Sequence, residues 1–259
     1  MIENNNNHRN HNFHRFFDWW LGELNINLQH LISAANHQHN FEDDSVLLPL
    51  IDKVVGHYEN YYKVKSNGAK RDVISMFAPT WLTSLENSLL WIAGWRPTTA
   101  IHLLYSKSGI QLEAKLADLV PVLTDDLSDL SIIQINRIDE LHKETIREER
   151  IISESLALMQ ESVADTLMVD LSNSISEKMR NDKDDDGEIR DIDLEVELMF
   201  NLKKGELEEV LHKADSLRIE TLKAVVAILT PIQVVYFLIA AAELHLRIHD
   251  WGQKMDKTT

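Results

Sequence analysis

The sequence predicts an all-α protein, and three features of the chain lead to this prediction. Apolar residues recur at spacings of three and four over long stretches, which is the period of one helix face. Only 8 Gly and 5 Pro interrupt the 259 residues, as expected of long helices joined by few turns. No stretch alternates apolar and polar residues clearly enough to predict a strand. We therefore expect a single multi-helix bundle with long helices.

Two amphipathic helices are predicted in the first quarter of the chain, on either side of a polar break. The apolar face of the first consists of Phe17, Trp20, Leu24, Leu28 and Leu31. The second begins at Asp44 or Ser45, either of which can cap a helix N-terminus. Its apolar face consists of Leu47, Leu50, Ile51, Val54, Tyr58 and Tyr61.

The next two helices are predicted from their ends. Thr83 and Glu86 have the spacing of a capping box, in which each residue's side chain bonds the other's backbone N–H. We expect the helix that follows to end near Gly94. Pro97 then begins another helix at its first position, where a missing N–H has no cost, and that helix ends near residues 108–109.

The second half of the chain predicts three further helical stretches. Ser131 and Gln134 form a second capping box before a long helix. An apolar stripe continues along it, which we interpret as facing the core: Ile152, Leu156, Met159, Val163, Leu167, Leu171 and Ile175. An acidic loop near 181–193 interrupts the pattern, and a helix resumes at Leu194 or Glu206 and runs to Leu229. Thr230, Pro231 and Gln233 then predict the start of the last helix.

The domain organisation follows from composition. No Pro/Gly/Ser-rich linker divides the chain, so residues 13–252 are predicted to form one helical domain. Residues 1–12 are rich in Asn and His with little to bury, which predicts a disordered polar leader. Residues 253–259 are predicted to be a flexible tail.

Composition also excludes several classes of function. The absence of Cys removes disulfides and thiolate chemistry, and the net charge of −16 repels phosphate backbones, so no direct nucleic-acid binding is expected. No phosphate loop, dinucleotide turn or nucleophile elbow is present, so we expect no catalytic residues and no enzyme activity. The polar start predicts no signal peptide, and the apolar stretch 224–242 is broken by polar residues, so no membrane span is expected.

The acidic segment carries one metal-binding pattern. Asp182, Asp184 and Asp186 match ligand positions one, three and five of an EF-hand calcium loop, and a glycine follows at position six. Glu188 and Asp193 complete the candidate set. The short Asp193 at position twelve and the absence of a second loop weaken the pattern. Two interpretations of the segment therefore stay open, a calcium site and a solvated acidic loop that binds no metal.

Aromatic residues are the other candidate ligand surface. A cavity between helices could be lined by Trp19, Trp20, Tyr58, Tyr61, Trp81, Trp91 and Trp95, although core packing of these rings is the favoured interpretation. We expect Trp81, Trp91 and Trp95 to be buried. Arg96 is expected to pair with a carboxylate or with helix-end carbonyls.

Four blocks in order resemble the Delay of Germination domain of plants, which also forms the C-terminal half of TGA-type bZIP transcription factors. The blocks are residues 57–73, 81–105, 214–222 and 228–240, and the resemblance runs from about Phe13 to Gly252. It implies a non-catalytic interaction protein of seed dormancy and abscisic-acid signalling, located in nucleus and cytoplasm. The implied partners are type 2C protein phosphatases, and a homodimer is left open.

The resemblance also implies a cofactor. His245 and His249 lie four residues apart in a segment resembling the germination-regulator branch, which is associated with haem. Both are therefore candidate haem ligands, one ligating and the other supporting, against the alternative of a plain surface pair. TGA-type relatives are associated instead with an apolar, lipid-like ligand.

Three alternative functions stay open at this stage. The chain could be a transcriptional co-regulator that pairs with TGA-like bZIP factors through the shared domain. It could be a calcium-responsive helical switch, or a factor in pollen-wall patterning.

Overall fold

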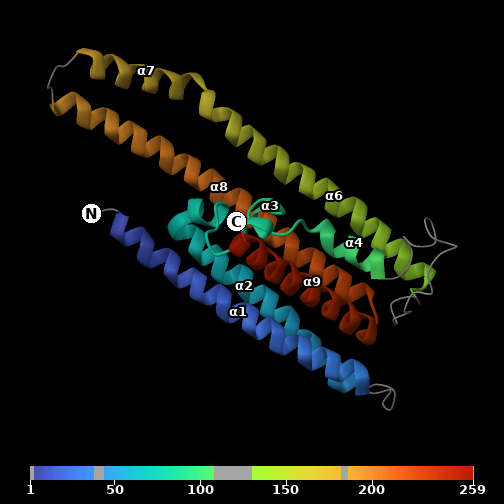
Figure 1. The fold of residues 1–259 in the computed structure, drawn as a ribbon. Helices are drawn as coiled ribbons and strands as arrows, with labels where there is room; N and C mark the ends of the chain where they lie inside the picture. Colours follow the sequence, from blue (N-terminus) through green and yellow to red (C-terminus); the bar gives the residue numbers. More distant parts are fainter. Residues whose placement is uncertain (1–2, 38–43, 108–129, 182–185, 259) are drawn as a thin grey trace.

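The structure is a computed structural model that describes residues 3–37, 44–107, 130–181 and 186–258. Its helices, shown in Figure 1, are α1 (Glu3–His37), α2 (Asp44–Phe77), α3 (Ser84–Ser88), α4 (Thr98–Lys107), α6 (Ile132–Glu161), the short 3₁₀ turn η2 (Ser162–Ala164), α7 (Thr166–Asn181), α8 (Asp186–Ile228) and α9 (Pro231–Thr258). Within these ranges no strand occurs, only an isolated bridge between Trp91 and Gly94. The all-α prediction is therefore confirmed.

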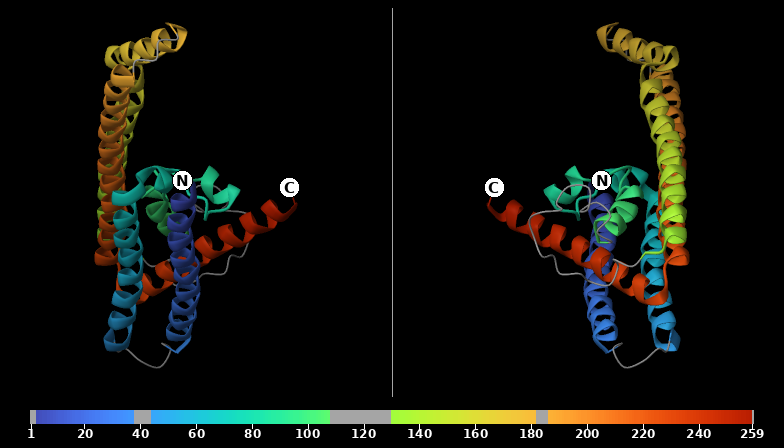
Figure 2. Two further views of the ribbon diagram at one scale, coloured as in Figure 1. Left: turned by 90° about the vertical axis from the view of Figure 1, so that its left-hand side faces the viewer. Right: turned by 90° about the vertical axis from the view of Figure 1, so that its right-hand side faces the viewer.

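The helices form a body and a projecting arm. In the body, α9 packs against α1, α2, α3 and α4, while α2 also packs against α1 and α8. Helices α6 and α8 lie side by side, and with α7 they extend well beyond the rest of the molecule (Figures 1 and 2). The N-terminal part of α8 therefore belongs to the arm and its C-terminal part to the body.

The body contains two hydrophobic clusters. One surrounds Phe17, Trp20 and Leu24, and the other surrounds Ile101 and Phe237. All five residues of the predicted first helix face are buried, as are Leu47, Ile51 and Val54 of the second. The hydrophobic pattern therefore identified the inward faces of α1 and α2 correctly.

Three predicted helix starts are confirmed in detail, whereas Pro97 lies one residue before α4, which begins at Thr98. Thr83 with Glu86, and Ser131 with Gln134, form reciprocal capping boxes. Pro231 is the first residue of α9, and the backbone N–H of Thr230 donates to Gln233 at 2.9 Å.

Three predicted segments differ from the structure because helices extend further than expected. Helix α1 begins at Glu3, within the predicted leader, and α9 continues through the predicted tail to Thr258. Helix α8 begins at Asp186, so the predicted acidic loop is helical from that residue onward. Adding a residue to an existing helix costs far less than nucleating one, and acidic residues are favourable in a first turn.

Helix α3 ends earlier than predicted. It stops at Ser88 rather than near Gly94. Ile92 (φ 45°) and Ala93 (φ 56°) occupy the left-handed region, which a continuing right-handed helix cannot include. Gly94 therefore does not close α3.

The long apolar stripe is core-facing only at its start. Ile152 is buried, whereas Val163 and Leu167 are 56% and 63% exposed. The prediction of a core-facing stripe is thus wrong for the arm. Helices in the arm have few neighbours, and each neighbour covers only the side that faces it.

Helix α9 is long and apolar enough to cross a membrane by length and composition. In the structure it lies among four body helices, with residues such as Val235, Leu238 and Ala242 buried. This core position accounts for part of its apolar character.

Candidate functional site

The segment between α3 and α4 forms a tight, left-handed turn at the centre of the candidate site. The backbone N–H of Trp91 donates to the Gly94 carbonyl at 2.8 Å, and that of Gly94 donates back at 3.2 Å. Non-glycine residues rarely adopt positive φ, and Ile92 and Ala93 do so side by side. Such a conformation persists only when the surroundings hold it.

Two buried cations from other helices hold this turn. The Arg218 guanidinium of α8 donates to the carbonyls of Trp91, Ile92 (2.9 Å) and Trp95 (2.6 Å). The Lys65 ammonium of α2 donates to the Ala93 carbonyl at 2.6 Å. Four of the five carbonyls from 91 to 95 are therefore bound by charged donors, which form stronger hydrogen bonds than neutral ones.

Asp215 joins the two cations into one buried network, called here the cationic clamp (Lys65, Asp215, Arg218). Its Oδ1 accepts from Lys65 at 3.0 Å and from Arg218 at 2.5 Å. Burial lowers the pKa of Lys65 to about 8, against the opposing effect of Asp215. The clamp holds two positive charges and one negative charge, and the dipoles of the turn's carbonyls offset the excess.

Gly94 is required by the clamp. A Cβ at this position would lie 2.7 Å from Cζ of Arg218, closer than real Cβ contacts allow. The glycine therefore admits the guanidinium to the turn, which is a different role from the helix end predicted from sequence.

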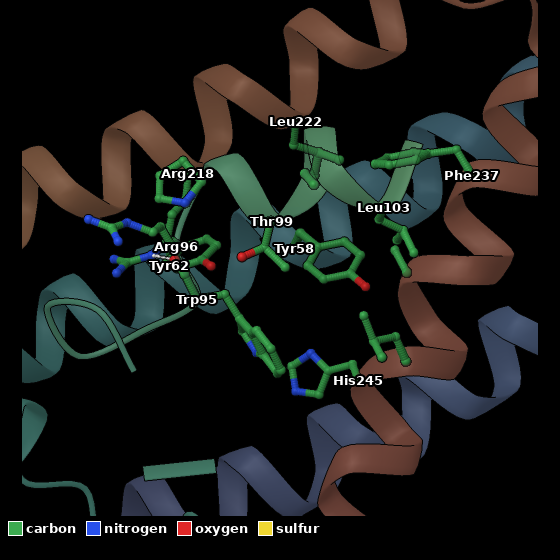
Figure 3. Close-up of a pocket in the computed structure, with 14 residues that line it drawn as sticks. Tyr58, Tyr62, Trp95, Arg96, Thr99, Leu103, Arg218, Leu222, Phe237 and His245 are labelled. Atoms are coloured by element: carbon green, nitrogen blue, oxygen red, sulfur yellow. Dashed lines mark hydrogen bonds between the residues drawn. The ribbon is translucent and has the colours of Figure 1, made fainter. Parts of the chain in front are cut away.

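An apolar cavity of about 130 Å³ lies directly beside the clamp. Figure 3 shows Arg218 and Tyr62 at one end and Trp95 with His245 at another. The other lining residues include Tyr58, Leu103, Leu222 and Phe237. A second cavity of about 50 Å³ is also lined by Trp95, His245, Tyr58 and Tyr62. Those four side chains border both spaces.

His245 is a neutral histidine facing these cavities. Its ring centroid lies 5.2 Å from that of Trp20 and 5.7 Å from that of Trp95. Burial lowers its pKa to about 4, so the imidazole is uncharged at neutral pH. A neutral imidazole can accept a hydrogen bond or ligate a metal.

His249 has a different environment. Its Nδ1 lies 2.9 Å from Oε2 of Glu86, the carboxylate that also accepts from the Thr83 N–H and hydroxyl. The bond to Glu86 raises the pKa of His249. Burial alone would raise the pKa of Glu86, but its bonds from His249 and Thr83 lower it. This contact joins α9 to α3, and it is an ion pair when the His249 imidazole is protonated.

The haem expectation meets this geometry only in part. The neutral, cavity-facing His245 has the right donor chemistry, whereas Nδ1 of His249 is engaged by Glu86 and its Nε2 lies 3.0 Å from Gln253 Nε2. A cavity of about 130 Å³ is also small beside the ~300–1,000 Å³ of typical ligand pockets. A haem macrocycle does not fit this conformation.

The calcium candidates are less fully described. Asp182 and Asp184 lie outside the described residues, while Asp186, Glu188 and Asp193 belong to α8. An EF-hand loop requires a sharp turn at its sixth position, and the residue at that position is helical here because α8 begins at Asp186. No group of three or more metal-ligating side chains occurs in the described part of the chain.

The aromatic and arginine predictions have mixed outcomes. Trp81 is buried as predicted, but Trp91 and Trp95 are only half-buried. The indole N–H of Trp91 donates to the Ser153 hydroxyl at 3.0 Å, and Trp95 lines the cavity. Trp19 is 53% exposed and lines neither space described above. Arg96 pairs with Glu149 at 2.9 Å, as predicted.

Comparisons with known proteins decide the family. A family model described as "DOG1: Seed dormancy control" matches residues 27–106, which include Lys65 and the turn. Protein DOG1-like 2 of Arabidopsis thaliana is 31% identical over 247 residues, covering 92% of this chain and 89% of the relative. The chain belongs to the DOG1 family.

Other relatives extend the DOG1 comparison to transcription factors. Protein DOG1-like 3 of Arabidopsis thaliana is 29% identical over 92% of this chain and 82% of its own length. Transcription factor TGA2 of Arabidopsis thaliana is 28% identical over 91% of this chain but only 60% of its own length. Homology to both groups supports a plant regulatory protein.

Proposed function

We propose that this DOG1-family chain is a non-catalytic interaction protein of seed dormancy and abscisic-acid signalling that binds type 2C protein phosphatases. Family membership carries the proposal. The buried charges of the clamp are engaged in holding backbone, and Arg218 does so at one end of the cavity.

A direct binding assay tests this proposal. The full chain, immobilised, should bind purified plant type 2C phosphatases, and a phosphatase of unrelated fold serves as the control. Failure of every type 2C phosphatase to bind would contradict the proposal. Tagged protein in plant cells should occur in both nucleus and cytoplasm.

The TGA relatives support a second candidate function, a co-regulator that pairs with TGA-like bZIP factors. Transcription factor TGA2 shares the domain over 91% of this chain, and this shared domain is the part through which the two proteins would pair. Co-purification from nuclei should recover a bZIP partner if this function is correct. Recovery of phosphatases without any bZIP protein would exclude it. A role in pollen-wall patterning stays open beside both.

Haem binding is proposed only through His245, since that imidazole is neutral and faces the cavity. The cavity would have to widen. In a hemin titration, His245→Ala should abolish the shift of the Soret band, and His249→Ala should retain it. The reverse pattern would exclude His245 as the ligand.

Calcium binding by the acidic segment stays a prediction. Titration calorimetry should give heat with calcium that disappears in the double variant Asp182→Ala, Asp184→Ala. No heat at millimolar calcium, the weak end of known sites, would leave only a solvated acidic segment.

A further inference from the structure

A long groove runs between α6 and α8 on the surface of the helix pair. Its volume is about 730 Å³, and its lining comes from residues 141–155 of α6 and 212–224 of α8. The floor is apolar, with Ile151, Ile152 and Leu217, and Ile151 is 48% exposed. Ile152 and Leu217 are buried at its base, so Ile151 is the one of the three that reaches solvent. Exposed apolar side chains that continue along such a groove mark an interaction surface.

The groove continues along the arm. Lys203 of α8 contacts the Ser162 hydroxyl, so residue 203 lies level with residue 162 in this antiparallel pair. Leu158 lies one heptad beyond Ile151, and Leu202 lies two heptads before Ser216, which lines the groove. Positions seven apart lie on one line along packed helices. Leu158 and Leu202 therefore extend the apolar floor, and they are 67% and 54% exposed.

The rims of this surface are acidic. Glu144, Glu148 and Glu220 line the groove itself, and Glu206 and Glu209 lie between it and Leu202. The basic side chains nearby are paired with these glutamates: Arg147 with Glu144 and Glu148, Lys213 with Glu209 at 2.6 Å, and Lys203 with Glu206 at 3.1 Å. The five glutamates outnumber these three basic side chains, so the rims keep a negative excess. The whole chain carries a net charge of −16. An occupant of opposite charge is favoured, and a second copy, an anionic bilayer or a nucleic acid is repelled.

We propose that the acidic groove (Ile151, Leu158, Leu202 and the flanking Glu144, Glu148 and Glu220) docks a basic amphipathic helix of a partner protein. The partner's apolar stripe packs on the three apolar residues, as a third helix added to the α6–α8 pair. Its Lys and Arg side chains meet the glutamates of the rims. This proposal extends the interaction role described above to a defined surface and a partner chemistry.

A designed peptide tests the groove without knowledge of the natural partner. The probe is a fluorescent helix of about 18 residues, about 27 Å long, with Leu along one face and Lys on its flanks. The control peptide has the same composition in scrambled order, so its charge is identical but its Leu residues share no face. Fluorescence anisotropy with the full chain should show at least about tenfold tighter binding of the patterned peptide.

Matched variants locate the binding site. Ile151→Ser with Leu158→Ser removes apolar surface without changing charge and should weaken binding about tenfold or more. Ile74→Ser, at an exposed position on α2, is the control and should bind like the unmodified chain. Glu144→Gln with Glu148→Gln and Glu220→Gln should weaken binding and reduce its salt dependence. Circular dichroism confirms that each variant is folded.

Several outcomes would overturn the proposal. Equal binding of the scrambled peptide, or full binding by the Ile151, Leu158 variant, would indicate non-specific charge attraction. Concentration-dependent dimers that disappear in that variant would indicate a second copy as occupant. Variant-sensitive binding to phosphatidylserine vesicles would indicate a membrane surface. None of these results bears on phosphatase binding at another surface, so the two proposals fail separately.

Discussion

At the scale of single residues, the cationic clamp shows how buried charge can fix a backbone shape. Lys65 and Arg218 are each almost fully buried, and each is bound to Asp215 and to carbonyls of one turn. Removing one member of such a network leaves an uncompensated charge inside the protein. We expect the clamp to be sensitive to conservative substitution for this reason.

Gly94→Ala should destabilise the protein by about 1–3 kcal/mol, because the added methyl group overlaps the Arg218 guanidinium. Gly22→Ala is the matched control. That glycine lies within α1 with nothing within 4 Å of a built Cβ, so alanine there should stabilise by roughly 0.5–1 kcal/mol. Urea denaturation measures the free energy of unfolding of both variants. Equal changes in that free energy would contradict the close contact between Gly94 and the Arg218 guanidinium.

The pair His249–Glu86 should make stability depend on pH. Folding raises the pKa of His249 above 6.5, so its contribution is complete below pH 6.5 and is lost as pH rises through the folded value. Folding lowers the pKa of Glu86 below 4.5, so its contribution is complete above pH 4.5 and is lost at lower pH. The destabilisation caused by His249→Gln should therefore be largest between pH 4.5 and 6.5.

His245 changes the pH dependence of stability in the opposite direction to His249. Its folded pKa of about 4 lies below 6.5, so the unfolded chain binds the extra proton and stability falls as pH drops from 6.5 to 4. Urea titrations across this range, with and without His249→Gln, separate the two effects. A pH-independent difference between them would mean that the ion pair with Glu86 does not form in solution.

At the scale of elements, the last turns of α9 hold α3 in place. Gly252 lies so close to Thr83 that a Cβ would be 2.1 Å from its hydroxyl oxygen. Asp256 accepts a hydrogen bond from the Ser84 N–H at 3.0 Å, at the N-terminus of α3. The short α3 is thus stabilised by its capping box and by the chain's C-terminal segment together.

Deleting residues 253–259 should therefore lower stability by about 1 kcal/mol, the size of one lost hydrogen bond to an exposed helix end. A flexible tail would have no effect. Thermal unfolding of the truncated chain measures the difference, and substitution Lys257→Ala within the intact chain is the control. An unchanged melting temperature after truncation would contradict the α9–α3 contact.

At the scale of the whole molecule, body and arm differ in how much surface they bury. Body helices are covered on several sides, whereas the arm consists of α7 and the ends of α6 and α8 alone. Apolar residues of the arm such as Leu198 and Leu202 are more than half exposed, in contrast to Leu24. Local stability follows burial, so the arm should open before the body.

Hydrogen exchange should show this order directly. Amides of α7 and of the first half of α8 should exchange faster than those of α9. Leu198→Ser should change the free energy of unfolding by less than about 0.5 kcal/mol, while Leu24→Ala should cost about 2–5 kcal/mol. Equal protection of arm and body would mean that the arm is covered in solution.

Much of this fold could be predicted from local sequence. The faces of α1 and α2, the capping boxes at Thr83 and Ser131, and the start of α9 at Pro231 all follow from contacts within a few residues. These features depend on helix period and end chemistry, which a short stretch of chain contains in full.

The site and the arm depend on packing between segments that are far apart in the sequence. Lys65 and Asp215 are 150 residues apart in sequence, and nothing local indicates that they meet at one turn. The separate environments of His245 and His249 depend on Glu86 from another helix, although a four-residue spacing suggested a shared ligand. Helix periodicity places Leu167 and Ile152 on one apolar stripe. Only the packing of neighbouring helices determines that Ile152 is buried and Leu167 is exposed. Local sequence specifies the helices, those ends that carry a capping box or a proline, and the apolar faces, because these are local properties. Which faces are buried and which charges meet was determined by packing between distant segments, which no local pattern records.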